Sequence, residues 1–382
     1  MSSTPPTPNP PPRVATPSAP RRGGRWLHLP QNRLRRLLFV GIYLLFCWGV
    51  ALLGIKSFWS FYTGVPLNQS PLTVDFFYGE VRRSKVKEVH PQHADDHFDV
   101  LLLGGSVLTP EWGSVERCLA DKLRNATGNR FRVFNLAWPA HTSRDSLIKY
   151  WLVADEQFDL VLVYDGINDV TMNCCPREEF RDDYLHFSWY REVAEALDAG
   201  KISLPIRLTS ELPLLGPGFF RQNLKPETME FGREIKTVGP LRRNQEGIIG
   251  AATTRNDRVL LMTFAYDIPL DIPDEKFADR GQERFRSGRF TPWGKAEYVA
   301  ATLDAQNAAI RDLADQHPEV LFVDERKLMP EQQGLFVDPC HLSDEGSRRF
   351  VENLWPAVEL RVRAWQGAMA GRKRAAGKHV PE

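Results

Sequence analysis

Lysine, aspartate and glutamate are missing from the beginning of the chain. Residues 1–36 contain seven arginines and none of these three residue types, and eight of the first 20 residues are proline. A segment of this composition cannot bury an apolar core of its own. We therefore predict a disordered basic leader over residues 1–36.

Cysteine is scarce as well, since five cysteines in 382 residues are too few for a disulfide scaffold. The chain also lacks a metal-binding spacing of cysteine or histidine, a P-loop and a GxGxxG fingerprint, so we expect no metal or organic cofactor. Beyond residue 36, the 49 basic residues less the seven of the leader leave 42 against 48 acidic ones, a formal charge of −6. This balance argues against a nucleic-acid partner.

Charge is absent from one further stretch. Residues 37–55 form an uncharged run of 19 residues, "LLFVGIYLLFCWGVALLGI", which as a helix nearly spans a hydrocarbon core of about 30 Å. A cleaved signal peptide is the alternative, but the run exceeds the usual apolar region of about 7 to 15 residues, and "KSFWSFYTGV" contains no A-x-A-like cleavage site. We predict an uncleaved transmembrane anchor in contact with the lipid bilayer.

The orientation of this anchor follows from its flanks. Arg33, Arg35 and Arg36 precede the apolar run, whereas Lys56 is the single basic residue directly after it. Basic residues favour the cytoplasmic side of a membrane. The sequence thus predicts a single-pass protein of the cell membrane, with a cytoplasmic amino terminus and a periplasmic or extracellular catalytic domain.

Alternating apolar and amphipathic segments follow a polar connector over residues 63–96. The apolar runs are "FDVLLL" (98–103), "FRVFNLA" (131–137), "DLVLVY" (159–164), "RVLLMTF" (258–264) and "EVLFVD" (319–324). Helical patterns cover residues 113–127, 143–156, 295–316 and 343–368. Short apolar strands alternating with helices predict an α/β fold whose parallel sheet is covered on both faces.

Two segments are longer than simple crossovers between strands, residues 171–257 and 265–294. Insertions of this length usually wall or cover a site at the carboxyl edge of the sheet. We predict one catalytic domain over residues 97–370 that contains both insertions, followed by a basic tail over residues 371–382.

Three polar motifs stand at predicted strand ends. "GGS" follows the first strand and places Ser106 at the carboxyl edge of the sheet, where Gly105 permits a tight turn, although a helix-capping serine is the alternative. "DGIND" follows the third strand and is also a natural turn sequence. "DPCH" comes after the fifth strand and places Asp338 three residues before His341. A surface pair or a helix cap is the alternative for these two residues.

Together the motifs supply the parts of acyl-transfer chemistry. A serine hydroxyl is a weak nucleophile that needs a base such as His341, and an aspartate such as Asp338 fixes the imidazole tautomer. The tetrahedral intermediate needs donors for its oxyanion, which the Asn168 amide and backbone N–H groups can provide.

These blocks resemble those of the SGNH, or GDSL-like, hydrolase superfamily over about residues 98–352. "LLLGGSV" is similar to the nucleophile block, with Gly-Gly-Ser in place of the commoner Gly-Asp-Ser, "DGIND" is similar to the Gly-x-Asn-Asp block and "DPCH" to the Asp-x-x-His block. The resemblance implies a three-layer α/β/α sandwich with a five-stranded parallel sheet in the order 2-1-3-4-5. It assigns the triad to Ser106, Asp338 and His341, with Gly105, Gly166 and Asp169 in support.

The second block departs from the family pattern. In "FNLAWPAHTS" the framing residues Asn135 and Thr142 are present, but Ala140 stands at the glycine position. The resemblance implies an oxyanion hole formed by the backbone N–H groups of Ser106 and Ala140 and by the Asn168 side chain. Alanine retains the N–H group, and we expect it to be acceptable only at a negative φ.

The segments that carry Cys174, Cys175 and Cys340 should emerge at the same edge of the sheet. We therefore predict a disulfide from Cys340 to either Cys174 or Cys175, with buried thiols as the alternative.

The function that these observations predict is hydrolysis of an ester outside the cytoplasm, on an acylated glycan or lipid, through an acyl-enzyme on Ser106. An O-acyltransferase acting on a cell-envelope glycan would share the acyl-enzyme step. A catalytically inactive glycan-binding or scaffold protein of the same fold is the third hypothesis.

Overall fold

The computed structural model describes residues 31–69, 71–86, 96–199, 226–268, 293–330 and 334–376. The chain divides into two units, Met1–Gly54 and Ile55–Glu382. Most of the predicted leader, most of the 265–294 insertion and the last residues of the basic tail lie outside the described residues.

An apolar helix, α1 (Gln31–Thr63), begins in the first unit and ends in the second. Its segment Asn32–Thr63 has a mean hydropathy of 2.4 in its most apolar part, none of which is buried against protein. One such helix near the amino terminus fits a single-pass membrane anchor or a signal sequence.

The second unit contains a five-stranded sheet in which every paired strand is parallel and the order is β2-β1-β3-β4-β5. The strands are β1 (Phe98–Gly104), β2 (Phe131–Asn135), β3 (Leu160–Tyr164), β4 (Val259–Met262) and β5 (Leu321–Val323). The predicted order 2-1-3-4-5 is confirmed, and each strand overlaps its predicted apolar run.

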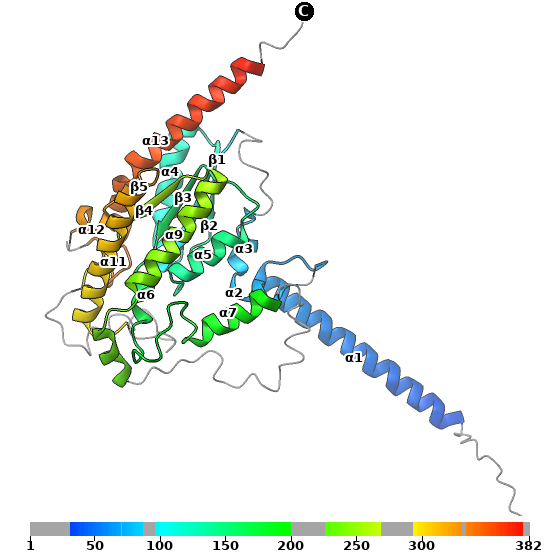
Figure 1. Ribbon diagram of the computed structural model, residues 1–382. Coiled ribbons are helices and arrows are strands. Elements are labelled where there is room, and N and C mark those ends of the chain that lie inside the picture. The colour runs from blue at the N-terminus through cyan, green and yellow to red at the C-terminus, as the bar shows by residue number, and fades with distance from the viewer. Residues whose placement is uncertain are drawn as a thin grey trace, which may run out of the picture. The chain divides into compact units, whose positions relative to one another are not determined.

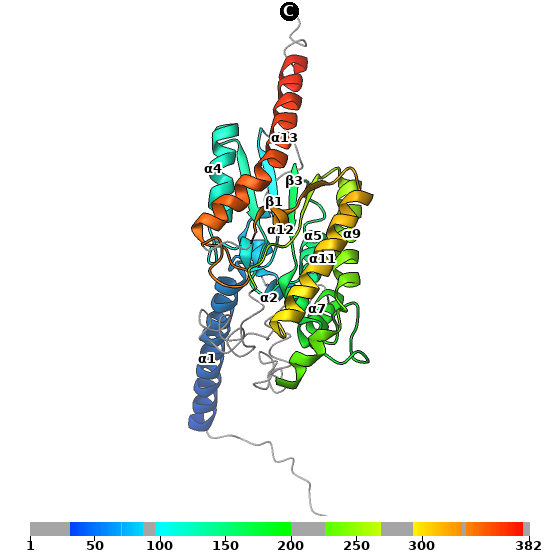
Figure 2. The same cartoon turned by 90° about the vertical axis from the view of Figure 1, so that its left-hand side faces the viewer.

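Helices cover both faces of this sheet and make the predicted three-layer sandwich (Figures 1 and 2). The longer helices are α4 (Val115–Thr127), α5 (Ser143–Leu152), α7 (Ser188–Ala199), α9 (Val238–Arg255), α11 (Ala296–Gln316) and α13 (Asp344–Ala376). The short ones are α2 (Thr73–Phe77), α3 (Gly79–Arg83), η2 (Ser106–Leu108), α6 (Ile167–Thr171), η4 (Pro226–Arg233) and α12 (Glu325–Leu328).

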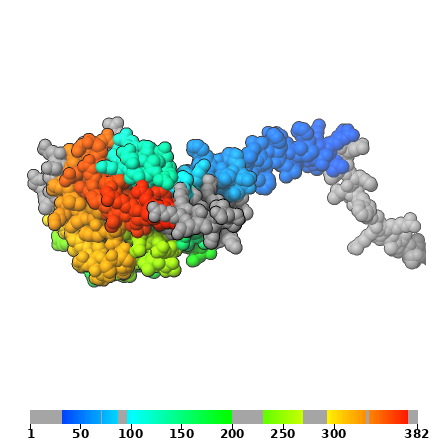
Figure 3. Space-filling model, turned by 90° about the horizontal axis from the view of Figure 1, so that it is seen from above, coloured from blue at the N-terminus to red at the C-terminus, as the bar shows by residue number. Residues whose placement is uncertain are grey.

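The alternation of side chains along the strands builds two separate cores. Leu102 of β1 packs with α4 and α13 on one face, and the neighbouring Leu101 packs with α5 and α9 on the other. Helix α11 contributes to both cores, with Leu303 in the first and Ile310 in the second. In the space-filling view α13 lies against α4 on the surface (Figure 3).

The predicted connector (63–96) and the predicted insertion (171–257) both contain helices that pack in the core. The connector contains α2 and α3. Phe77 of α2, Tyr78 between the two helices and Val81 of α3 are buried in the core that also holds α5 and α9. The 171–257 insertion ends in α9, which is the crossover helix that leads into β4. Residues 72–83 are therefore part of the folded domain.

Candidate active site

Ser106 lies in a turn that two glycines allow, directly after β1. A Cβ on Gly104 would lie 2.5 Å from the carbonyl oxygen of Tyr164, and a Cβ on Gly105 would lie 2.4 Å from Nδ2 of Asn168. Both distances are far below van der Waals contact, so only glycine lets β1 and β3 bring these groups so close. The close approach places Ser106 beside Asn168 at the carboxyl edge of the sheet.

The three predicted triad residues form one hydrogen-bonded chain. Oγ of Ser106 lies 2.7 Å from Nε2 of His341, and Nδ1 of His341 lies 2.6 Å from Oδ2 of Asp338. A carboxylate can only accept, so Nδ1 carries the proton and Nε2 can accept one from the serine hydroxyl. The N-cap of η2 is Gly105, and Ser106 is the first residue of that helix, with its hydroxyl directed at His341.

Asp338 is held in the charged form that this chain requires. Burial alone would raise its pKa, but hydrogen bonds from the His341 ring and from the backbone N–H groups of Cys340 and His341 outweigh burial and lower the pKa below its usual range. The acid therefore stays ionised beside His341 at neutral pH.

Trp112, which the sequence motifs do not include, contacts His341. Its ring stacks on the imidazole of His341 with centroids 4.4 Å apart and planes at 28°. Trp112 stands in the loop between η2 and α4, where nothing in the sequence distinguishes it from a core aromatic. The stacked ring restricts the orientation of the imidazole against Ser106.

The Asn168 amide lies at the amino end of α6, next to the turn that contains Ser106. Its Nδ2 donates to the carbonyl oxygen of His141 at 2.8 Å, and an amide nitrogen carries a second N–H that this bond does not use. The turn before it needs Gly166, because a Cβ there would lie 2.7 Å from Cγ of Phe264. The side chain is thus oriented by a backbone carbonyl on one side.

Asp169 supports the same region from within the protein. Its carboxylate is fully buried and accepts from the backbone N–H of Ser143 at 2.9 Å, from the Ser143 hydroxyl and from the Tyr184 hydroxyl. Burial raises the pKa of Asp169 to about 6, although the Ser143 bonds oppose the shift. Asp169 therefore connects α6 to the start of α5.

Ala140 contradicts the expectation of a negative φ, since its φ is 65°. This is the left-handed region, which costs a residue with a Cβ about 1 to 2 kcal/mol. A turn in which the backbone N–H of His141 donates to the Trp138 carbonyl at 3.2 Å closes this segment. Ala140 therefore adopts a conformation that favours glycine.

The predicted disulfide is wrong, because Cys174, Cys175 and Cys340 all carry thiols. Sγ of Cys340 lies 3.5 Å from Nδ1 of His341, whereas the sulfurs of Cys174 and Cys175 point to the backbone carbonyls of Trp293 and Met172. The segments meet at one edge of the sheet, but their sulfurs face different partners. Burial raises the pKa of Cys175 to about 11, which keeps that thiol protonated.

Donor atoms that could hold a metal ion overlap with the triad. One atom each from Asp338, Cys340 and His341 lies within 4.8 Å of the others. An ion there would take Nδ1 of His341 away from Asp338. Such binding would compete with the hydrogen-bonded chain, so this set is better suited to proton transfer than to a resident metal.

Replacing Gly105 by alanine should lower kcat by about 10² to 10³, the typical cost of losing one oxyanion donor. The new Cβ would displace the Asn168 amide, which it would approach to 2.4 Å. Gly250→Ala is the matched control, because a Cβ at position 250 of α9 meets nothing within 4 Å. Equal ester turnover by the two variants in steady-state kinetics would argue against a role for the Asn168 amide.

No family model and no curated protein matches the chain. Solved structures do match. One is a GDSL-like lipase from Bacteroides thetaiotaomicron (14% identity, TM-score 0.40), and the match covers 72% of this chain and 95% of the lipase chain. Another is a catalytic mutant of an acetylxylan esterase from Geobacillus stearothermophilus (15% identity, TM-score 0.38), and the match covers 69% of this chain and 96% of the esterase chain.

Proposed function

We propose that the chain is a serine hydrolase that cleaves an ester through an acyl-enzyme on Ser106. The observation that carries this proposal is the hydrogen-bonded chain from Ser106 through His341 to Asp338, with distances of 2.7 and 2.6 Å. A nucleophile, a base and an orienting acid in this order are the parts that serine acyl transfer needs.

The proposed reaction has two steps. Oγ of Ser106 attacks the ester carbonyl while its proton passes to Nε2 of His341, and the bond to the leaving alcohol then breaks as His341 returns the proton to that oxygen. A water molecule next attacks the acyl-enzyme with His341 as base. The acid is released, and Ser106 regains its proton.

The oxyanion of each tetrahedral intermediate is bound by the backbone N–H groups of Ser106 and Ala140 and by the second N–H of Asn168. Support for this assignment comes from the fixed position of the Asn168 amide and from the left-handed Ala140 loop beside it. Donors held in place before the reaction need no reorganisation when charge develops.

The substrate class that we propose is an O-acyl group on a glycan or lipid outside the cytoplasm. The anchor of residues 37–55 and the basic residues before it support this location. An active site held at a membrane surface has acylated envelope glycans and lipids within reach.

A panel of acylated glycans, lipids and aryl esters incubated with the purified full-length chain tests the activity. Release of free acid supports hydrolysis, whereas mass analysis that finds the acyl group on an added sugar hydroxyl would identify an acyltransferase. Absence both of turnover and of fluorophosphonate labelling would contradict the proposal and favour a binding or scaffold protein.

Protease added to the outside of intact spheroplasts should degrade residues 63–382 and leave the leader intact. The arginines before the apolar run are expected to keep the leader in the cytoplasm. Spheroplasts opened with detergent provide the control in which both parts are cleaved. A protected carboxyl-terminal domain would show that the proposed orientation is wrong.

A further inference from the structure

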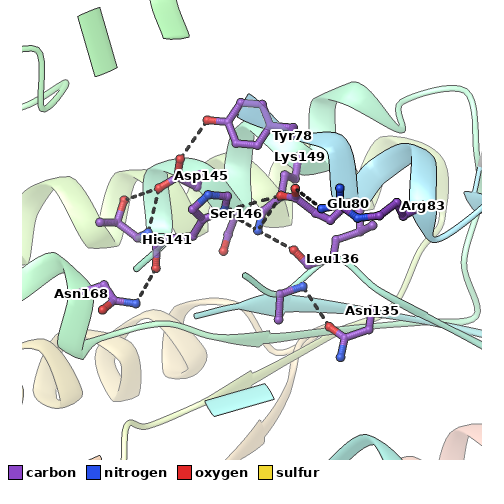
Figure 4. A network of polar contacts seen from close by, with 12 residues as sticks. Tyr78, Glu80, Arg83, Asn135, Leu136, His141, Asp145, Ser146, Lys149 and Asn168 are labelled. Carbon is purple, nitrogen blue, oxygen red and sulfur yellow. Dashed lines mark hydrogen bonds and ion pairs between the residues drawn. The ribbon is translucent and has the colours of Figure 1, made fainter. Parts of the chain in front are cut away.

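A buried cluster of ionisable side chains lies behind the loop that contains Ala140, outside the triad (Figure 4). Its members Glu80, His141, Asp145 and Lys149 are at most 5% exposed. Removing charged groups from water is costly unless partners compensate, and an apolar core would often be as stable. The position of this cluster beside the oxyanion loop suggests what it contributes.

Lys149 connects the two ends of that loop. Its Nζ extends from α5 and donates to the carbonyl oxygen of Leu136 at 2.5 Å and to Nδ1 of His141 at 3.0 Å. Leu136 directly follows β2, and His141 directly follows Ala140. One ammonium group therefore holds together both ends of the segment 136–141, in which Ala140 has a positive φ.

His141 transmits this contact to the active site. Its ring accepts from Lys149, and its backbone carbonyl accepts from Nδ2 of Asn168 at 2.8 Å. Burial lowers the pKa of His141 to about 3, so the ring is neutral. Its Nδ1 can therefore accept a hydrogen bond from Nζ of Lys149. A displacement of Lys149 would thus move the carbonyl that orients the Asn168 amide.

The counter-ion of Lys149 comes from the segment between α1 and β1. Oε1 of Glu80 in α3 lies 3.8 Å from Nζ of Lys149 and 3.6 Å from Nδ1 of His141. Burial raises the pKa of Glu80 to about 7, which the Lys149 ammonium opposes. The adjacent Tyr78 donates to Asp145 at 2.9 Å, so two residues of this segment contact the cluster.

We propose that Glu80 and Lys149 are positioning residues of the oxyanion hole: they hold segment 136–141 so that Ala140 and Asn168 keep their donors aimed at the reacting carbonyl. This inference rests on the proposed function. It assigns a role to the segment between the predicted membrane anchor and β1, since Glu80 of that segment forms the ion pair with Lys149.

The test is a double-mutant cycle between Lys149→Met and Asn168→Ala, made in the full-length chain. If Lys149 acts through Asn168, Lys149→Met should lower kcat on the best ester by at least about tenfold and leave KM within about twofold, because small misplacements of donors are costly. In the Asn168→Ala background the same change should cost much less. Glu80→Gln, which keeps the shape of the side chain, should show a smaller loss of the same kind.

The matched control is Arg132→Met, which breaks the ion pair of Arg132 with the buried Asp99 carboxylate at the amino end of β1. Lys149→Met and Arg132→Met should both lower the unfolding temperature of the protein, but Arg132→Met should keep the wild-type kcat. Equal losses of kcat from Lys149→Met and Arg132→Met would reduce the cluster to a structural role. Equal losses from Lys149→Met in the two Asn168 backgrounds would show that Lys149 does not act through Asn168. If Lys149→Met does not fold, Glu80→Gln carries the same comparison.

A readout without turnover separates this inference from the proposed function. Hydrogen–deuterium exchange should rise in peptides covering residues 136–145 and 166–171 in Lys149→Met and Glu80→Gln, but not in Arg132→Met. If the wild type cleaves no ester while this exchange pattern appears, the proposed function fails and the oxyanion-hole role fails with it, while the contact of Lys149 and Glu80 with segment 136–141 stands. If the wild type is active and neither exchange nor kcat responds, the network is wrong.

Discussion

Ser106→Ala should lower kcat for ester hydrolysis by about 10⁶-fold and abolish labelling by a fluorophosphonate probe, while its unfolding temperature stays near that of the wild type. The alanine removes the only atom that can attack the carbonyl, whereas His341 and Asp338 keep their 2.6 Å contact. Steady-state kinetics and mass analysis of the labelled peptide measure both effects.

Ser114→Ala is the control for this variant, because the Ser114 hydroxyl lies nearby in sequence but donates to Asp344 instead of His341. It should keep both turnover and labelling. Wild-type turnover by Ser106→Ala, combined with a loss of about 1 kcal/mol in the free energy of unfolding, would make the serine a structural residue.

The sheet and the three triad residues could be predicted because the signals are local. Each strand is a short apolar run, the motif of Ser106 directly follows β1, and the motif of Asp338 and His341 comes after β5, so the order of motifs and parallel strands predicts that Ser106 and His341 meet across 235 positions of sequence. The same reasoning placed Asn168 beside Ser106. These predictions needed the direction of the strands and no knowledge of side-chain packing.

The supporting residues could not be predicted because their contacts depend on packing. Glu80 stood in a segment predicted to be a polar connector, and nothing in the sequence identifies Lys149 of the predicted helix 143–156 as its partner, yet the two meet in the core at 3.8 Å. The disulfide failed for a related reason, since the location of Cys340 at the sheet edge did not reveal which way its sulfur points. The left-handed conformation of Ala140 likewise results from its surrounding turn.

Asp338→Asn should lower kcat by about 10⁴ and leave KM little changed, because it reverses the hydrogen bond to His341. An asparagine that presents its amide N–H to Nδ1, now 2.6 Å from Oδ2 of Asp338, would make Nδ1 an acceptor and leave the proton on Nε2. Nε2 would then be a donor toward Ser106 and could not take the serine proton.

The variant that controls for local disturbance of this loop is Cys340→Ser, whose side chain also lies beside His341, with Sγ 3.5 Å from Nδ1. It leaves the Asp338 carboxylate in place and should retain most of the wild-type kcat. Fluorophosphonate labelling should slow in Asp338→Asn as turnover does, since both reactions need His341 to accept the Ser106 proton. A variant that lost turnover but was labelled at the wild-type rate would place the function of Asp338 after serine attack, and a variant that kept both would remove Asp338 from the catalytic chain.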